Sequence, residues 1–126
     1  MKNCSYCGSH WDKTRDHVIP NSYLREGRGY EGDWLVPACK ECNGTLGDIL
    51  LTNVPDRATY LLSKYRRKYK KLLSFADWTD WELEDISDRL ADSIRATRAQ
   101  KQEMIDRINH LELVSGFDIE YMKPED

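Results

Sequence analysis

Two short stretches, Cys4-Ser5-Tyr6-Cys7 and Cys39-Lys40-Glu41-Cys42, decide the fold of this 126-residue chain. Each C-x-x-C turn sets two sulfur atoms on one side of a tetrahedron of ligands, the arrangement that Zn²⁺ prefers. The four cysteines are therefore predicted to hold one structural zinc ion across the insertion formed by residues 8–38. Because four sulfur ligands leave no coordination site for water, this ion is not expected to take part in catalysis.

The cellular compartment supports a metal site over disulfides. No apolar run approaches the roughly 18 residues that a membrane span requires, and the residues before Cys4 lack the apolar stretch of a secretory signal. We therefore expect a cytoplasmic protein with no membrane partner. In a reducing compartment, paired cysteines are typical of metal binding.

Two regions are predicted along the chain. Residues 1–51 hold all four cysteines and six of the seven glycines, so this segment needs the metal to stabilise it. Within it we expect a strand over 14–19 ended by Pro20, a loop over 25–33, a strand over 34–36 ended by Pro37, and a helix after Cys42. Residues 52–126 form a helical region that contacts DNA, dimerises, or does both.

The helical region begins with a helix over about 55–73, for which Asn53 is the predicted cap and Pro55 lies in the first turn. A second helical pattern runs from the capping box of Thr79 and Glu82 to a stop at Gly116. A helix of about 30 residues is roughly 45 Å long, more than one small domain covers. Either it breaks or its outer part packs on a second copy; we favour a homodimer through this long helix. The predicted fold class is α+β, a small zinc-stapled module followed by two or three α-helices, the last one long.

Charge is unevenly distributed along a chain whose net charge is −3. Residues 64–71 carry six positive charges and no negative one, whereas residues 77–92 carry seven acidic side chains and one basic. The two stretches could pair within the chain. The basic run could instead follow a phosphate backbone, since a chain that is acidic overall can still present a local cationic face.

The insertion contains Thr14-Arg15-Asp16-His17-Val18-Ile19-Pro20, and Asn43 directly follows the last cysteine. Together with Leu35-Val36-Pro37-Ala38-Cys39, these residues resemble the HNH endonuclease superfamily, with its ββα-metal fold, over about residues 4–48. The whole arrangement looks like small phage-encoded HNH proteins, which would place it in a bacterial host cytoplasm. The Cys-Asn ending is similar to the endonuclease VII-type resolvases, which are dimers.

The resemblance implies that His17 is the general base, because a neutral imidazole near pH 7 can take a proton from water. It implies that Asp16 and Asn43 hold a catalytic Mg²⁺ or Mn²⁺ ion, since carboxylate and amide oxygens suit such hard cations. On a strand, Asp16 and His17 point to opposite faces, so a local distortion before Pro20 is expected to bring both to the phosphate.

DNA is the partner that the resemblance implies. Arg15, Arg25, Arg28 and Lys40 are the residues expected to position the strand to be cut. A second set is expected to give salt-sensitive, sequence-independent binding: Lys64, Arg66, Arg67, Lys68, Lys70 and Lys71.

One position departs from the family pattern. The family usually has Asn just before Leu-Val-Pro-Ala-Cys, where it helps to orient the base, but this chain has Trp34. The alternative to a metal-dependent DNA endonuclease is therefore a catalytically impaired HNH-fold zinc module that binds DNA or a protein partner. A weaker alternative is a zinc-stapled helical protein that acts on a host factor.

Overall fold

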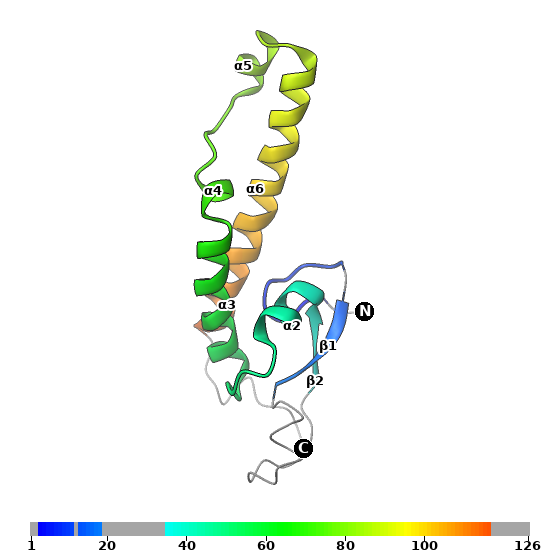
Figure 1. Cartoon of the computed structure of the whole chain (residues 1–126), viewed down its shortest axis with the longest axis vertical. Helices are drawn as coiled ribbons and strands as arrows, with labels where there is room; N and C mark the ends of the chain where they lie inside the picture. The colour runs from blue at the N-terminus through cyan, green and yellow to red at the C-terminus, as the bar shows by residue number, and fades with distance from the viewer. Residues whose placement is uncertain (1–2, 12, 19–34, 117–126) are drawn as a thin grey trace.

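The structure is a computed structural model that describes residues 3–11, 13–18 and 35–116. Its elements follow the order of a two-stranded sheet and then helices, the last of them long (Figure 1). The predicted α+β class is therefore confirmed. The elements are β1 (Lys13–His17), β2 (Leu35–Cys39), α2 (Lys40–Leu46), α3 (Val54–Lys68), α4 (Lys70–Leu73), α5 (Asp80–Glu84) and α6 (Asp88–Ser115).

Strands β1 and β2 pair antiparallel, with Asp16 opposite Val36 and His17 opposite Leu35. The prediction that Pro37 ends the second strand was wrong, because β2 continues through it to Cys39. A sheet of two strands consists only of edges, so a proline is tolerated where its missing N–H would face away from the partner strand. The Pro37 carbonyl is used outside the sheet, since it accepts a hydrogen bond from Ser5 N at 2.8 Å.

Helix α2 begins at Lys40, earlier than the sequence predicted, because Cys39 serves as its N-cap. Helix α3 begins as expected, with the Asn53 side chain accepting a hydrogen bond from Asp56 N at 2.8 Å. The predicted single helix over 55–73 is interrupted at Tyr69, whose φ of −103° and ψ of 19° separate α3 from α4.

The second helical pattern also consists of two helices. The capping box of Thr79 and Glu82 is confirmed at the start of α5, and α6 ends at Gly116 as predicted. The expected continuous helix over 79–115 was wrong, because Ser87 begins α6 anew by accepting a hydrogen bond from Leu90 N. Helix α6 alone has 28 residues, or about 42 Å at 1.5 Å per residue.

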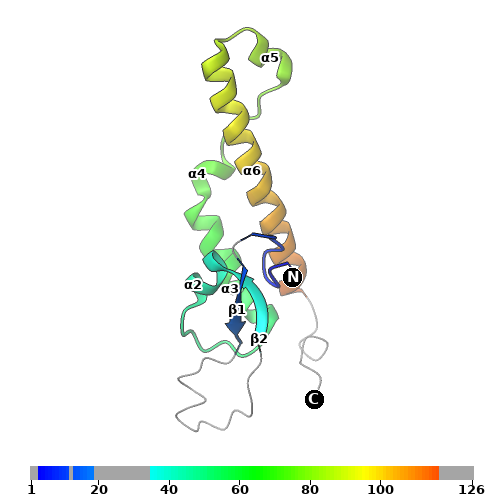
Figure 2. The same cartoon turned by 90° about the vertical axis from the view of Figure 1, so that its right-hand side faces the viewer.

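The molecule is elongated because α6 projects beyond the sheet (Figures 1 and 2). Its inner half packs with α3 and the cysteine-rich region around one apolar core. Its outer half is covered by the preceding segment of the same chain. There Ala91 and Ile94 of α6 form a second small cluster with residues of that segment, namely Phe75, Trp78, Leu83 and Ile86. Helix length therefore does not require a second copy, and the homodimer stays a prediction.

The main core contains residues of both regions predicted from the sequence, among them Tyr6, Cys42 and Leu61. The division at residues 51 and 52 therefore stays a prediction. Within the described ranges, none of the helices is long and apolar enough to cross a lipid bilayer.

Candidate functional site

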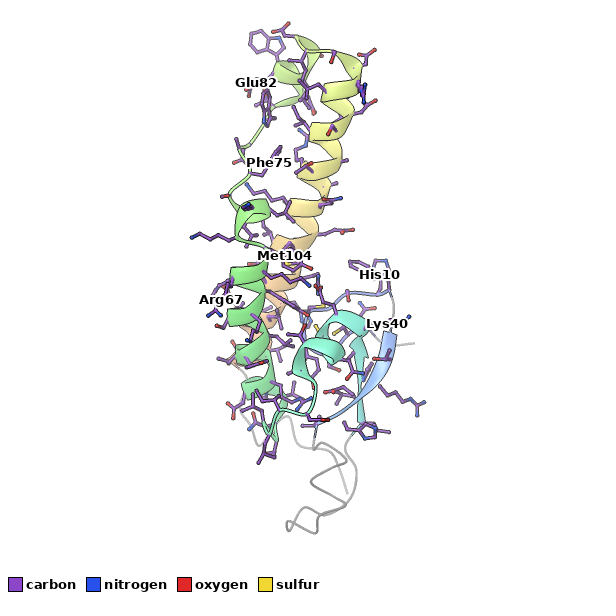
Figure 3. The ribbon with its side chains drawn as sticks, in the orientation of Figure 1. His10, Lys40, Arg67, Phe75, Glu82 and Met104 are labelled. Atoms are coloured by element: carbon purple, nitrogen blue, oxygen red, sulfur yellow. The ribbon has the colours of Figure 1, made fainter. Side chains whose placement is uncertain are left out.

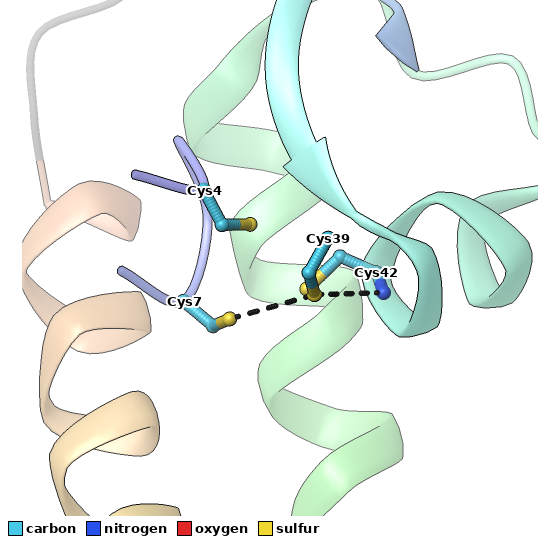
Figure 4. A group of neighbouring side chains, drawn as sticks. All are labelled: Cys4, Cys7, Cys39 and Cys42. Carbon is cyan, nitrogen blue, oxygen red and sulfur yellow. Dashed lines mark hydrogen bonds between the residues drawn. The ribbon is translucent and has the colours of Figure 1, made fainter. Parts of the chain in front are cut away.

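The four cysteines are buried together where the N-terminal turn meets the end of β2 and the first turn of α2 (Figure 4). All four sulfur atoms lie within 4.8 Å of one another, and Cys7 Sγ is 3.7 Å from Cys39 Sγ. Sulfur atoms about 2.3 Å from a tetrahedral Zn²⁺ would be about 3.8 Å apart, whereas disulfide sulfurs are about 2.05 Å apart. The cysteines are free thiols, positioned to hold a metal ion such as zinc.

The crowding of four thiols changes their acidity. Hydrogen bonds from neighbouring thiols, that of Cys39 first, lower the pKa of Cys7. A hydrogen bond to Cys39 raises the pKa of Cys42, because the thiol that donates is held protonated. A bound divalent cation would remove this competition, since each sulfur would then donate electrons to the metal as a thiolate.

Asp16 lies on the inner side of β1, where only 2% of its surface is exposed. Its carboxylate forms an ion pair with the fully buried guanidinium of Arg57, from the first turn of α3. Arg57 Nη2 donates to Asp16 Oδ2 at 2.7 Å and to Oδ1 at 3.0 Å, and the Tyr6 hydroxyl donates to Oδ2 at 2.5 Å. The predicted metal ligand is thus already bound to a cation of its own chain.

Arg57 also connects the strand to its surroundings. Its Nη1 donates to the carbonyls of Val18 and Leu51, and its Nε donates to the Tyr6 hydroxyl, each at 3.0 Å. Burial raises the pKa of Tyr6, and the charge of Asp16 raises it further. The phenol therefore stays protonated, and its hydroxyl donates a hydrogen bond to the carboxylate. Arg57 thus holds the Asp16 side chain on one side of His17 and the Val18 carbonyl on the other.

His17 is half-buried at the end of β1. The strand is regular through this residue, and alternation points its side chain to the side of the exposed Arg15, away from that of Asp16. The bend in the chain begins at Val18, after the Asp-His pair. The distortion expected before Pro20 is therefore absent as far as His17, and Pro20 lies outside the described residues.

Asn43 extends from α2 onto β1. Its Nδ2 donates to Thr14 Oγ1 at 2.9 Å and to the Arg15 carbonyl at 3.3 Å. These two bonds fix the orientation of the amide and leave Oδ1 without a hydrogen bond in the described part of the chain. Asn43 Oδ1 is therefore an oxygen that could bind a hard cation beside the strand that carries His17.

Of the basic residues predicted to contact DNA, Arg25 and Arg28 lie outside the described residues, as does Trp34. The other eight are exposed: Arg15, Lys40, Lys64, Arg66, Arg67, Lys68, Lys70 and Lys71. Lys40 and Arg67 project from opposite sides of the molecule (Figure 3). The basic residues thus form two groups, one beside the sheet and one on α3 and α4.

Some of these charges have partners in the chain. Arg66 pairs with Glu112 and Lys68 pairs with Glu41, and Lys64 lies 5.3 Å from the centre of the Tyr60 ring. The acidic stretch 77–92 pairs with the basic residues of α6, namely Arg95, Arg98 and Lys101. Among the ion pairs of these two fully described stretches, none joins one to the other, so the pairing considered from the sequence is not observed.

The sequence interpretation missed four residues of this region: Tyr6, Arg57, Tyr65 and Arg107. The sequence does indicate that the two arginines are buried, because each falls on the apolar face of its helix at the spacing of its core neighbours. A charged residue at such a position is buried with a partner. The two tyrosines had no such signal, since tyrosine is common in cores.

Residues 4–48 match the family model described as HNH endonuclease. The match begins at the first cysteine and ends just after α2, so it includes both cysteine pairs, Asp16, His17 and Asn43. Comparisons with curated proteins and with solved structures gave no match. The resemblance predicted from the sequence is thereby confirmed: residues 4–48 match the HNH endonuclease family model, which is consistent with membership of the HNH endonuclease superfamily.

Proposed function

We propose that the chain is a metal-dependent endonuclease that hydrolyses phosphodiester bonds in DNA. The observation that carries this proposal is the family match over residues 4–48, which contains a cysteine cluster able to hold zinc and an Asn43 amide fixed against the strand of His17. In this proposal the zinc is structural, and the catalytic ion is Mg²⁺ or Mn²⁺.

His17 is proposed to be the general base. It would take a proton from the attacking water, for which an imidazole near neutral pH is suited. Arg57 supports this role indirectly, because it holds the Asp16 side chain and the Val18 carbonyl on either side of the histidine. The base would therefore act from a strand end that is already fixed.

Asn43 and Asp16 are the residues proposed to hold the catalytic ion, whose chemistry would be to stabilise negative charge on the phosphate and the leaving oxygen. Asn43 fits directly, because its Oδ1 has no hydrogen bond with any described residue. Asp16 fits less well. A carboxylate oxygen can accept about two hydrogen bonds; Oδ2 already accepts two, while Oδ1 accepts one, from Arg57. Because Arg57 is so close, we expect the ion to bind weakly.

DNA is the proposed substrate. Arg15 and Lys40 flank the proposed catalytic residues in the chain and are exposed, so they would position the strand to be cut. Arg67, Lys70 and Lys71 are exposed and have no ion pair in the described part of the chain, so they could neutralise phosphates on a second surface. Arg25 and Arg28 are further proposed contacts.

Plasmid nicking by zinc-loaded protein in the presence of Mg²⁺ or Mn²⁺ tests the proposal. We expect His17→Ala to lower the cutting rate by about 100-fold or more, as loss of a general base typically does, with zinc content and folding retained. Asn43→Ala should also lower the cutting rate, because it removes a proposed ligand of the catalytic ion. His10→Ala is the matched control, since His10 is an exposed histidine of the same domain. No cutting of duplex, single-stranded or branched DNA by wild-type protein with either ion would refute the proposal.

The ion pair of Asp16 favours a second candidate function, a catalytically impaired HNH-fold module that binds DNA or a protein partner. In that case Arg57 takes the place of the catalytic cation and Asp16 is a structural residue. Salt-sensitive DNA binding without cutting would support this second candidate. In that case Arg67→Gln and Lys71→Gln should weaken DNA binding, and Mg²⁺ should have no effect on the affinity for DNA.

A further inference from the structure

Arg107, on the inner half of α6, is a buried cation with too little negative charge around it. Only 8% of its surface is exposed. Its Nη2 lies 2.7 Å from Glu41 Oε1, yet neither Nη2 nor Nε makes a well-aligned hydrogen bond with the described residues. Glu41 also pairs with Lys68 at 2.6 Å, so its single negative charge is shared between two cations.

The cysteine cluster is a further source of negative charge near Arg107. Arg107 and Cys7 line the same pocket, so the buried guanidinium lies beside the cluster. Four thiolates around one Zn²⁺ carry a net charge of −2. Glu41, Lys68 and Arg107 together carry a net charge of +1. A zinc tetrathiolate would therefore supply negative charge beside the buried guanidinium.

Tyr65, on α3, contacts the same cluster through its hydroxyl. Its Oη donates a hydrogen bond to Cys42 Sγ at 3.0 Å, and the Arg107 guanidinium lies 4.9 Å from the centre of its ring. A tyrosine hydroxyl has an ordinary pKa of about 10, so it is protonated at neutral pH and can act as the donor. Groups that donate hydrogen bonds to metal-bound sulfur stabilise the thiolate form.

Helix α6 contacts the cysteine turn at a second point, one turn beyond Arg107. His110 Nδ1 lies 2.8 Å from the Tyr6 carbonyl, within the first C-x-x-C turn. The His110 ring also lies against Gly8, where a Cβ atom would come within 2.8 Å of His110 Cδ2. The inner face of α6 is therefore fitted to the turn that supplies Cys4 and Cys7.

We infer that Arg107 and Tyr65 are outer-shell partners of the zinc tetrathiolate, so that zinc binding and the docking of α6 on the cysteine turn are one coupled event. Both residues lie outside the segment that matches the HNH family. The helices thus complete the metal centre by supplying a charge and a hydrogen-bond donor. This inference is independent of the proposed nuclease activity.

Competition for zinc with a chromogenic chelator, using the full chain, measures the contribution of each partner. Loss of an outer-shell hydrogen bond typically weakens metal affinity about 10- to 100-fold. We therefore expect Tyr65→Phe to weaken zinc binding by about 10-fold and Arg107→Met by at least as much. Tyr60→Phe, on the same helix, and Arg98→Met, in the outer half of α6, are matched controls and should stay within about twofold of wild type.

The absorption of the cobalt-substituted protein gives a readout that a merely structural role would not change. Removal of the Tyr65 hydroxyl should shift the sulfur-to-cobalt charge-transfer band, because that hydroxyl donates to a ligating sulfur. The Tyr60→Phe control should leave the band in place. The inference is overturned if Tyr65→Phe retains both wild-type zinc affinity and the wild-type band. This variant decides the outcome even if Arg107→Met fails to fold.

Discussion

The ion pair between Arg57 and Asp16 should make Arg57→Met one of the most destabilising substitutions in the chain. Both side chains are buried, so removing the guanidinium leaves a carboxylate without its cation. Breaking a buried pair in this way typically costs about 3–5 kcal/mol. Methionine is an unbranched side chain of similar reach, so loss of packing adds little to this figure.

The contacts of Arg57 favour the upper part of that range. The guanidinium donates to both oxygens of Asp16 and to Tyr6 Oη, Val18 O and Leu51 O. A domain of this size has a total free energy of unfolding of about 5–15 kcal/mol, so a loss of about 4 kcal/mol is a large share. Urea unfolding of the zinc-loaded protein, followed by circular dichroism, measures it as a lower midpoint.

A matched control and a double-mutant cycle separate the ion pair from a general effect of losing an arginine. Arg66→Met removes an exposed partner of Glu112, with side chains 54% and 48% exposed, and should cost at most about 1 kcal/mol. The cycle uses Arg57→Met, Asp16→Asn and the double variant. If the double variant loses as much as the two single variants added together, the pair is not coupled and the reasoning is wrong.

Two further substitutions test the local structure. Ser87→Ala removes the cap that begins α6 and should lower the free energy of unfolding by about 1 kcal/mol, which is measured as a lower thermal midpoint. Ser93→Ala, within the same helix, is the control. Equal midpoints for the two variants would contradict the role of the cap. Gly8→Ala places a Cβ on a residue with a φ of +76° and against the His110 ring, so it should cost about 1–3 kcal/mol in urea unfolding. Wild-type stability of this variant would show that the contact between the turn and α6 is loose.

The fold was predictable where a local chemical rule acts alone. The spacing of the cysteines predicts the metal cluster, the Thr79 and Glu82 pair predicts the start of α5, and Asn53 predicts the start of α3. The two caps each join atoms within four residues, and each cysteine pair is equally local, although the metal cluster joins two such pairs that are 32 positions apart. Tertiary structure can change the surroundings of such a motif without removing its hydrogen bonds or ligands.

The helix and strand boundaries that were predicted wrongly depend on weaker sequence signals. The break between α5 and α6 rests on Ser87, a residue that is also tolerated inside helices, so the apolar period across it resembles one long helix. The extension of β2 through Pro37 depends on β1 being its one neighbouring strand among the described residues, and no local sequence pattern predicts this. Strand and helix ends of this kind are decided by the neighbouring element.

The environment of Asp16 was not predictable for a related reason. Its partner Arg57 is 41 positions away in the sequence, and the family pattern that marks Asp16 ends at residue 48. The misplaced charge on the apolar face of α3 indicates that Arg57 is buried, but not which anion it meets. Only the packing of α3 against β1 supplies that answer.

The cations that balance the HNH-type segment come from the helices. Among the described residues of 4–48, one carboxylate and four sulfur atoms are buried, and arginines from α3 and α6, Arg57 and Arg107, lie beside them. The segment in isolation would leave Asp16 and a zinc tetrathiolate without these partners, at the cost of uncompensated charge in an apolar core. A change in how α3 or α6 packs must therefore alter the charge balance around both Asp16 and the metal. The helices are thus part of the electrostatics of the candidate site, even though the family match does not include them.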